Sequence, residues 1–265
     1  MRLKAISLFL AIQVLSFGIW QTTSSHNEVL ANEPVAEVHP ASEKDQSNVD
    51  FSIRNFNESI VNLNIAQKKK INEALRELPE EHASSVEKIV LDYNKNAGRG
   101  LGGNNLIILR GINMSYEELI GVLIHETAHN VDYDYLSPKK MVEKSGFKDG
   151  PHPLYITDPS IDFYRISWEN ELNLKNTASN LDFVSGYAMS DPFEDFAETY
   201  TYYVLHNADF KALAVSSPKL YAKYRFMKYR VFSGVEFDTG DGIVNLNNRS
   251  WDTTILNYSL SDFLT

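Results

Sequence analysis

Residues 114–133, MSYEELIGVLIHETAHNVDY, contain two histidines four positions apart, with a glutamate directly after the first. In an α-helix, positions i and i+4 lie on one face about one turn apart. His125 and His129 can therefore reach one metal ion, and Glu126 lies beside them. The HExxH pattern is typical of zinc peptidases, whose histidines bind zinc and whose glutamate acts as general base. A helix with two incidental histidines is the alternative interpretation.

The residues around this motif predict that it lies on a helix. Ser115 precedes Glu118 by three positions, which is the pattern of a capping box at a helix start. Apolar residues then follow on one side of the predicted helix: Leu119, Val122, Leu123 and Ala128. Pro138 ends the predicted helical region. The motif therefore has the local structure that its geometry requires.

The composition limits the class of protein. A chain of 265 residues with 43% hydrophobic residues can form one large domain or two lobes around a cleft. Its formal net charge of -10 argues against a nucleic-acid partner and against electrostatic attachment to a membrane. We expect a monomer that acts on a protein or peptide substrate.

The first residues predict export. Arg2 and Lys4 precede an apolar stretch from residue 5 to residue 20, as in a secretory signal peptide. The stretch is short for a membrane span and has no positive stop-transfer flank, although a retained membrane anchor is the alternative. Cleavage after Ala31 and cleavage near Ser25 are both compatible with the sequence.

The chain contains no cysteine, which excludes disulfides, lipoprotein anchoring and a thiol nucleophile. Exported proteins without cysteine are typical of Gram-positive bacteria, so we expect a secreted, extracellular protein of such an organism. Association with the cell wall is a variant of this prediction. We divide the chain into a signal peptide (1–31), a polar linker or pro-segment (32–57) and a metallopeptidase domain (58–265).

The remaining pattern predicts several further elements. We expect a helix over 59–78, a strand over 86–93, a flexible Gly-rich connection over 96–104, a strand over 105–109 and a helix over 139–147. The strand before the motif lies where zinc peptidases commonly line their cleft and pair with an extended substrate. It provides four candidate substrate-binding residues, namely Asn105, Leu106, Ile107 and Ile108. An ordinary buried strand is the alternative interpretation.

A third metal ligand is predicted within residues 185–206, SGYAMSDPFEDFAETYTYYVLH. Pro192 marks a helix start, and Glu194 and Glu198 then lie one turn apart on one face. Asp195 is an alternative ligand. A third histidine in HExxHxxGxxH is excluded, because Asp132 and Tyr135 occupy the glycine and histidine positions.

HETAHNVD at 125–132, followed by YAMSDPFEDFAE at 187–198, resembles the catalytic domain of anthrax toxin lethal factor and the related bacterial Pro-Pro endopeptidases. The resemblance covers roughly residues 57–230, but only these two segments are specific. The segment between them is longer than we expect for the family, so the substrate-binding loops should differ. The resemblance does not include the toxin-docking domain of lethal factor.

The resemblance implies roles for individual residues. His125, His129 and Glu194 would bind one zinc ion per chain, and Glu126 would be the base. Tyr187 would donate to the oxyanion, and Asp132 and Glu198 match two further acidic positions. From the residues themselves, Glu198 is suited to accept the ring N–H of a zinc-bound histidine.

We therefore expect an α+β, zincin-like fold, with a small mixed sheet and the active-site helix in its upper part and a mainly helical lower part. The expected function is that of a secreted zinc-dependent endopeptidase of the Glu-zincin class, in which zinc and Glu126 activate a water. Two alternatives are a catalytically silent zinc-containing surface protein and a metal-dependent amidase that acts on cell-wall peptide.

Overall fold

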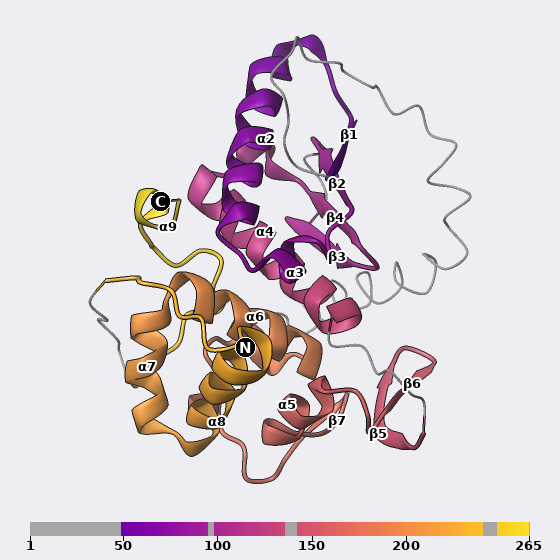
Figure 1. Ribbon diagram of the computed structural model, residues 1–265, viewed down its shortest axis with the longest axis vertical. Coiled ribbons are helices and arrows are strands. Elements are labelled where there is room, and N and C mark those ends of the chain that lie inside the picture. The colour runs from indigo at the N-terminus through magenta and orange to yellow at the C-terminus, as the bar shows by residue number, and fades with distance from the viewer. Residues whose placement is uncertain (1–48, 95–97, 136–141, 241–247, 265) are drawn as a thin grey trace, which may run out of the picture.

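The computed structural model describes residues 49–94, 98–135, 142–240 and 248–264. It has an upper part, built from a sheet and covering helices, and a mainly helical lower part (Figure 1). This mixed α and β architecture agrees with the expected class. Within the described ranges, no helix is long and apolar enough to cross a membrane. The predicted signal peptide, most of the predicted linker and Pro138 lie outside the described residues.

The upper sheet has four strands: β1 (Asp50–Arg54), β2 (Lys88–Asp92), β3 (Gly100–Gly103) and β4 (Leu106–Leu109). Their order is β1-β2-β4-β3. The first three strands in this order are parallel, and β3 runs antiparallel to β4 at the end of the sheet. Ile107 of β4 lies opposite Ile89 on one side and Gly102 on the other. Ile89 and Ile107 are fully buried, which explains the apolar runs in both strands.

Helices cover this sheet. They are α2 (Val61–Arg76), α3 (Glu80–Ala83) and α4 (Tyr116–Asn130). A 3-10 turn at Glu58–Ile60 precedes α2, and another at Gly111–Asn113 precedes α4. Helix α4 begins as predicted, because the Ser115 hydroxyl accepts the backbone N–H of Glu118 at 3.1 Å. The Glu118 carboxylate does not complete a capping box and instead pairs with Arg99 at 3.1 Å. A π-helical turn, Val131–Tyr135, continues α4.

The lower part is built on α5 (Ser160–Ser167), α6 (Pro192–Leu205), α7 (Asn207–Ser216), α8 (Pro218–Phe226) and a π-helical turn at Met227–Val231. Two small hairpins adjoin it, β5 (Lys144–Asp149) with β6 (His152–Tyr155) and β7 (Trp168–Asn170) with β8 (Asn173–Leu174). Short 3-10 turns at Asn180–Asp182 and Tyr187–Met189 (η5) lead into α6, and α9 (Leu260–Phe263) lies near the C-terminus. Helix α6 packs directly against α4.

Trp168 fills the core as expected, and it does so beside a buried ion pair. The Lys223 ammonium lies 2.7 Å from the Asp195 carboxylate, and both side chains are fully buried. The Trp168 indole N–H donates to the same carboxylate at 3.0 Å. This engagement explains why Asp195, the alternative ligand, points away from the histidines.

Three predictions about local structure were wrong. Residues 50–54 form β1 inside the predicted linker, because Ile53 is buried in the core against β2. Residues 100–103 form β3 in the predicted flexible connection. Residues 144–147 belong to strand β5 and not to a helix, and Gly146 there has a φ of +95°, which a helix does not allow.

Candidate metal centre

Helix α4 presents both histidines of the motif to the junction between the upper and lower parts. His125 is 6% exposed and Glu126 is 8% exposed, and their neighbours Thr127 and Ala128 are fully buried. The rings of His125 and His129 meet edge to face with centroids 5.0 Å apart. The i, i+4 spacing therefore brings the two imidazoles together, as expected.

Helix α6 brings a carboxylate to the same place. The Asp191 side chain caps this helix by accepting the backbone N–H groups of Phe193 and Glu194, at 2.9 and 2.8 Å. Glu194 consequently lies in the first turn, with Oε2 3.1 Å from Nε2 of His125 and 3.6 Å from Nε2 of His129. The ligand atoms of His125, His129 and Glu194 all lie within 4.8 Å of one another, as in a group that could hold a metal ion.

Glu198, one turn further along α6, fixes the orientation of His125. Its Oε1 lies 3.0 Å from Nδ1 of His125. The carboxylate is fully buried, and its Oε2 accepts the Ser185 hydroxyl at 2.5 Å and the Thr253 backbone N–H at 2.9 Å. When Nδ1–H donates to Glu198, the lone pair on Nε2 faces Glu194.

This arrangement provides a test of whether the group fits a metal. Nε2 of His125 and Oε2 of Glu194 are then two acceptors at 3.1 Å, which requires a proton or a cation between them. Burial lowers the pKa of His125, but the hydrogen bonds to Glu194 and Glu198 outweigh burial and raise it well above its usual value. Two imidazole nitrogens and one carboxylate oxygen, with a carboxylate behind one imidazole, form a donor set that fits catalytic zinc.

The Glu126 carboxylate lies beside this group, against strand β3. Burial raises its pKa, while the two histidines lower it. A Cβ atom added to Gly100 would overlap the Glu126 carboxylate, and one added to Gly102 would overlap the Glu126 backbone carbonyl. Strand β3 can therefore approach α4 closely only because it lacks side chains at these two positions.

Tyr187 lies at the centre, as the resemblance implied. Its phenol donates to Oε1 of Glu194 at 2.9 Å, and its ring stacks on His125 with centroids 6.1 Å apart. Burial raises the pKa of Tyr187 far above its usual value, and the charge of Glu194 adds to this effect. The phenol therefore keeps its proton and remains a hydrogen-bond donor.

Asp132 occupies a separate buried position just after α4. One carboxylate oxygen accepts the Tyr164 hydroxyl at 2.5 Å, and the other has no hydrogen-bond partner among the described residues. Burial raises its pKa to about 7. Within the described chain no hydrogen bond joins Asp132 to His125, His129 or Glu194, so its implied role remains a prediction.

The predicted cleft strand is not at the edge of the sheet. Residues 106–108 belong to β4, which is paired on both sides, and Asn105 precedes it with its side chain on Glu87. Ile107 and Ile108 are buried. The prediction that Asn105, Leu106, Ile107 and Ile108 line the cleft was therefore wrong, and β3 takes the edge position beside α4.

Two contributions to the site had no signal in the sequence. Arg99, directly before β3, donates to Thr254 at 2.7 Å and also forms an ion pair with Asp252. The Thr253 backbone N–H reaches Glu198, which lies 55 residues earlier in the chain. Backbone donors have no residue signature, so a motif search could not have identified this one.

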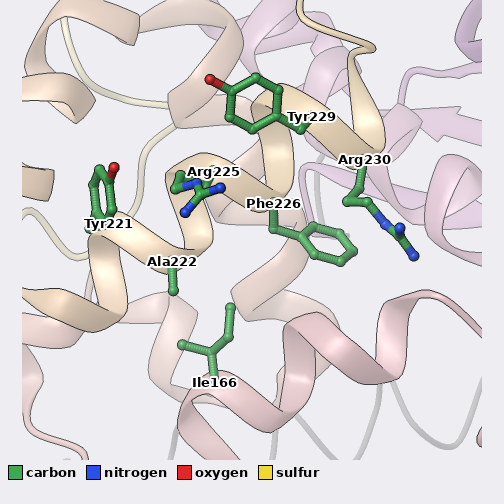
Figure 2. A pocket seen from close by; sticks show the side chains of 7 residues that line it. All are labelled: Ile166, Tyr221, Ala222, Arg225, Phe226, Tyr229 and Arg230. Atoms are coloured by element: carbon green, nitrogen blue, oxygen red, sulfur yellow. The ribbon is translucent and has the colours of Figure 1, made fainter.

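A shallow groove on α5, α8 and the following π-helical turn lies apart from this centre (Figure 2). Its lining consists of Ile166, Tyr221, Ala222, Arg225, Phe226, Tyr229 and Arg230. None of these residues belongs to the group formed by His125, His129 and Glu194. The groove is therefore a separate surface feature.

Residues 109–231 match the model of a family described as "Putative zinc-binding metallo-peptidase". The match supports a metallopeptidase family for this chain. It includes α4, η5 and α6, and with them every residue of the candidate metal group. It ends before the segment that carries Thr253. No curated protein and no solved structure matches the chain.

Proposed function

We propose that this chain is a zinc-dependent endopeptidase that uses one zinc ion held by His125, His129 and Glu194. The observation that carries the proposal is the convergence of these three ligand atoms within 4.8 Å, with Glu126 next to His125 on the same helix. A structural zinc site has no need of a neighbouring base, whereas a hydrolase does.

When bound, the zinc would act as a Lewis acid toward the scissile carbonyl and would lower the pKa of a water molecule. The protein side chains perform the remaining steps. Glu126 accepts the proton of the attacking water and returns it to the leaving amine. The buried Glu198 carboxylate holds His125 by its Nδ1–H, so that Nε2 faces the metal position.

Tyr187 stabilises the negative charge that develops on the substrate. Its hydroxyl donates to Glu194 at 2.9 Å and can turn from that carboxylate to the oxygen of the tetrahedral intermediate. Such a donor typically contributes roughly 10²–10³-fold to turnover. The phenol ring also stacks on the His125 ring, which keeps it beside the proposed metal position.

An extended peptide would bind along β3. This strand ends the sheet, pairs with β4 on one side only and lies next to Glu126. Addition of a strand to such an edge satisfies main-chain groups of the substrate and specifies no side chain. This proposal replaces β4 by β3 as the strand that holds the substrate.

The resemblance to the lethal factor catalytic domain supports the Glu-zincin class with Glu194 as third ligand. We also propose that the protein is exported. This part of the proposal depends on residues 1–31, which lie outside the described part of the chain. A zincin-like fold agrees with the position of α4 between the sheet and α6.

Hydrolysis of a randomised peptide library by the purified chain tests the proposal. We expect cleavage at internal bonds, loss of cleavage on chelation, and recovery on addition of zinc. Cleavage of peptidoglycan peptide without cleavage of any library peptide would indicate the amidase instead. Bound zinc without hydrolysis of either substrate would indicate the silent zinc protein.

A further inference from the structure

Residues 250–254, called here the C-terminal strap, lie against the candidate metal centre, although they follow the region that matches the family model. The Ser250 carbonyl accepts the backbone N–H of Gly186 at 2.9 Å, and the Trp251 carbonyl accepts the backbone N–H of Tyr187 at 2.6 Å. In Figure 1 the yellow C-terminal chain runs between the upper and lower parts toward α9. The strap is therefore hydrogen-bonded directly to the backbone of Tyr187, the proposed oxyanion donor.

Side chains and close packing fix the strap in place. Arg99 holds Asp252 and the Thr254 hydroxyl together. A Cβ atom at Gly121 of α4 would lie 2.8 Å from the Thr254 carbonyl oxygen, so the helix and the strap are in close contact. Thr253 and Thr254 are 0% and 4% exposed. Residues 252–254 of the strap are thus buried in a defined position.

Trp251 is the exception within the strap, since 55% of its surface is exposed. Its indole packs over Gly186, where an added Cβ would lie 2.7 Å from the ring. The indole centroid is 6.3 Å from the Tyr187 ring, which itself stacks on His125. The rings of His125, Tyr187 and Trp251 therefore lie in contact one after another, from the metal group to the exposed indole.

We propose that Trp251 forms the wall of a substrate subsite for an apolar or aromatic side chain next to the scissile bond. This inference rests on the proposed function, because it uses the scissile carbonyl placed at the Tyr187 hydroxyl. An exposed indole on a fixed backbone provides a large apolar surface with little loss of conformational entropy on binding. Trp251 would then supply side-chain selectivity that the glycines of β3 cannot supply.

The physical character of the subsite follows from its surroundings. The charge nearest to Trp251 along the strap is Asp252, which is 10% exposed and is paired with Arg99. The Asp252 carboxylate is thus engaged by Arg99, and the exposed part of the indole itself is an apolar, π-rich surface. Phenylalanine or leucine in the substrate buries apolar area there, whereas glycine does not.

The test uses two peptides that differ at one residue beside the cleaved bond, Phe in one and Gly in the other. In the full chain, Trp251→Ala should lower the ratio of kcat/KM for the Phe peptide over the Gly peptide by about 10-fold. Trp251→Phe should retain most of the ratio. Ile255→Ala is the matched control, because Ile255 is also apolar, lies just beyond the strap and is 56% exposed.

Gly186→Ala provides an independent perturbation, since its φ of -68° accepts alanine while the new Cβ displaces the indole. It should also lower the Phe-to-Gly ratio. An equal loss on both peptides for Trp251→Ala, with reduced zinc content, would show a purely structural strap and overturn the subsite. An unaltered ratio would overturn it as well.

Peptide binding separates failure of this inference from failure of the proposed function. The Phe peptide is titrated into zinc-loaded Glu126→Gln protein with and without Trp251→Ala. We expect the second substitution to weaken binding about 10-fold. If the wild-type chain cleaves no peptide, the proposed function fails, and this titration still decides the subsite. Equal binding by both proteins would contradict the subsite even if cleavage is found.

Discussion

Helices α4 and α6 contribute metal-binding side chains at helical spacing, whereas β3 contributes missing side chains and the C-terminal strap contributes a main-chain donor to Glu198. The helices supply His125, His129 and Glu194. Strand β3 supplies the space at Gly100 and Gly102, and the strap supplies the Thr253 N–H. Side chains at helical spacing leave a pattern in the sequence, and backbone contributions do not.

Removal of a metal-binding side chain should therefore have the largest effect on activity. Glu194→Ala should abolish zinc binding and lower hydrolysis by roughly three to five orders of magnitude, because the metal contributes several kcal/mol to the transition state. Metal analysis and library hydrolysis measure the two effects. Asp195→Ala is not a suitable control, since Asp195 pairs with the buried Lys223. Full zinc occupancy in Glu194→Ala would assign the third ligand elsewhere.

Strand β3 is tested by its glycines. Gly100→Ala should lower kcat about 10²-fold while zinc stays bound, because the new methyl group moves the Glu126 carboxylate. Gly102→Ala meets the backbone of α4 and should in addition reduce zinc affinity and stability. Gly98→Ala is the matched control from the same stretch, since a Cβ there has nothing within 4 Å. Normal turnover by Gly100→Ala would show that β3 does not confine the base.

The buried carboxylate behind His125 should have a smaller effect. Glu198→Gln retains the shape but weakens the acceptor for Nδ1–H, so zinc affinity should fall by about 10–100-fold. Competition with a chelator of known affinity measures the change. Ser185→Ala removes one of the other hydrogen bonds of Glu198 and should give a smaller loss in the same direction. Unchanged affinity in both variants would mean that the contact does not orient the ligand.

The stability of the α6 side should depend on pH through His82. This buried imidazole contacts the Tyr200 hydroxyl of α6 and the Val231 carbonyl, both at 3.0 Å. Burial lowers its pKa from 6.5 to about 4. The unfolded chain thus binds a proton below pH 6.5 that the folded chain takes up only near pH 4.

The contribution of His82 to the free energy of unfolding should therefore be complete above pH 6.5. It should fall by about 3 kcal/mol as the pH decreases to 4. Urea unfolding of the wild type and of His82→Gln over this range measures the difference in slope. An identical pH dependence in both proteins would contradict a neutral buried His82.

The same distinction explains which parts of the molecule the sequence predicted. Helix α4 followed from the Ser115 cap and the apolar periodicity, and α6 followed from Pro192 and the spacing of Glu194 and Glu198. Both patterns are local, because the helix itself brings residues three and four apart together. The contact of Glu198 with Nδ1 of His125 is a contact between two helices, and it could be anticipated only because Glu198 lies one turn after Glu194 on the same face of α6.

Strand β3 was not predicted because Gly100, Gly102 and Gly103 have low strand propensity and resemble a loop. Its pairing with β4 and its contact with α4 are tertiary effects that override this propensity. The strap is still further from the motif along the sequence, because Trp251 and Thr253 follow helices α5 to α8 of the lower part before they reach the centre. Their positions depend on Arg99 and Gly121, for which no local pattern exists.

The proposed role of Glu126 is tested most directly by measuring turnover and zinc content of Glu126→Gln beside the wild type. We expect one zinc ion per chain in both proteins and a loss of kcat of about 10²–10⁴-fold or more in the variant, because only the base has been removed. Full hydrolysis by zinc-loaded Glu126→Gln would contradict the assignment of Glu126 as the base and with it the proposed mechanism.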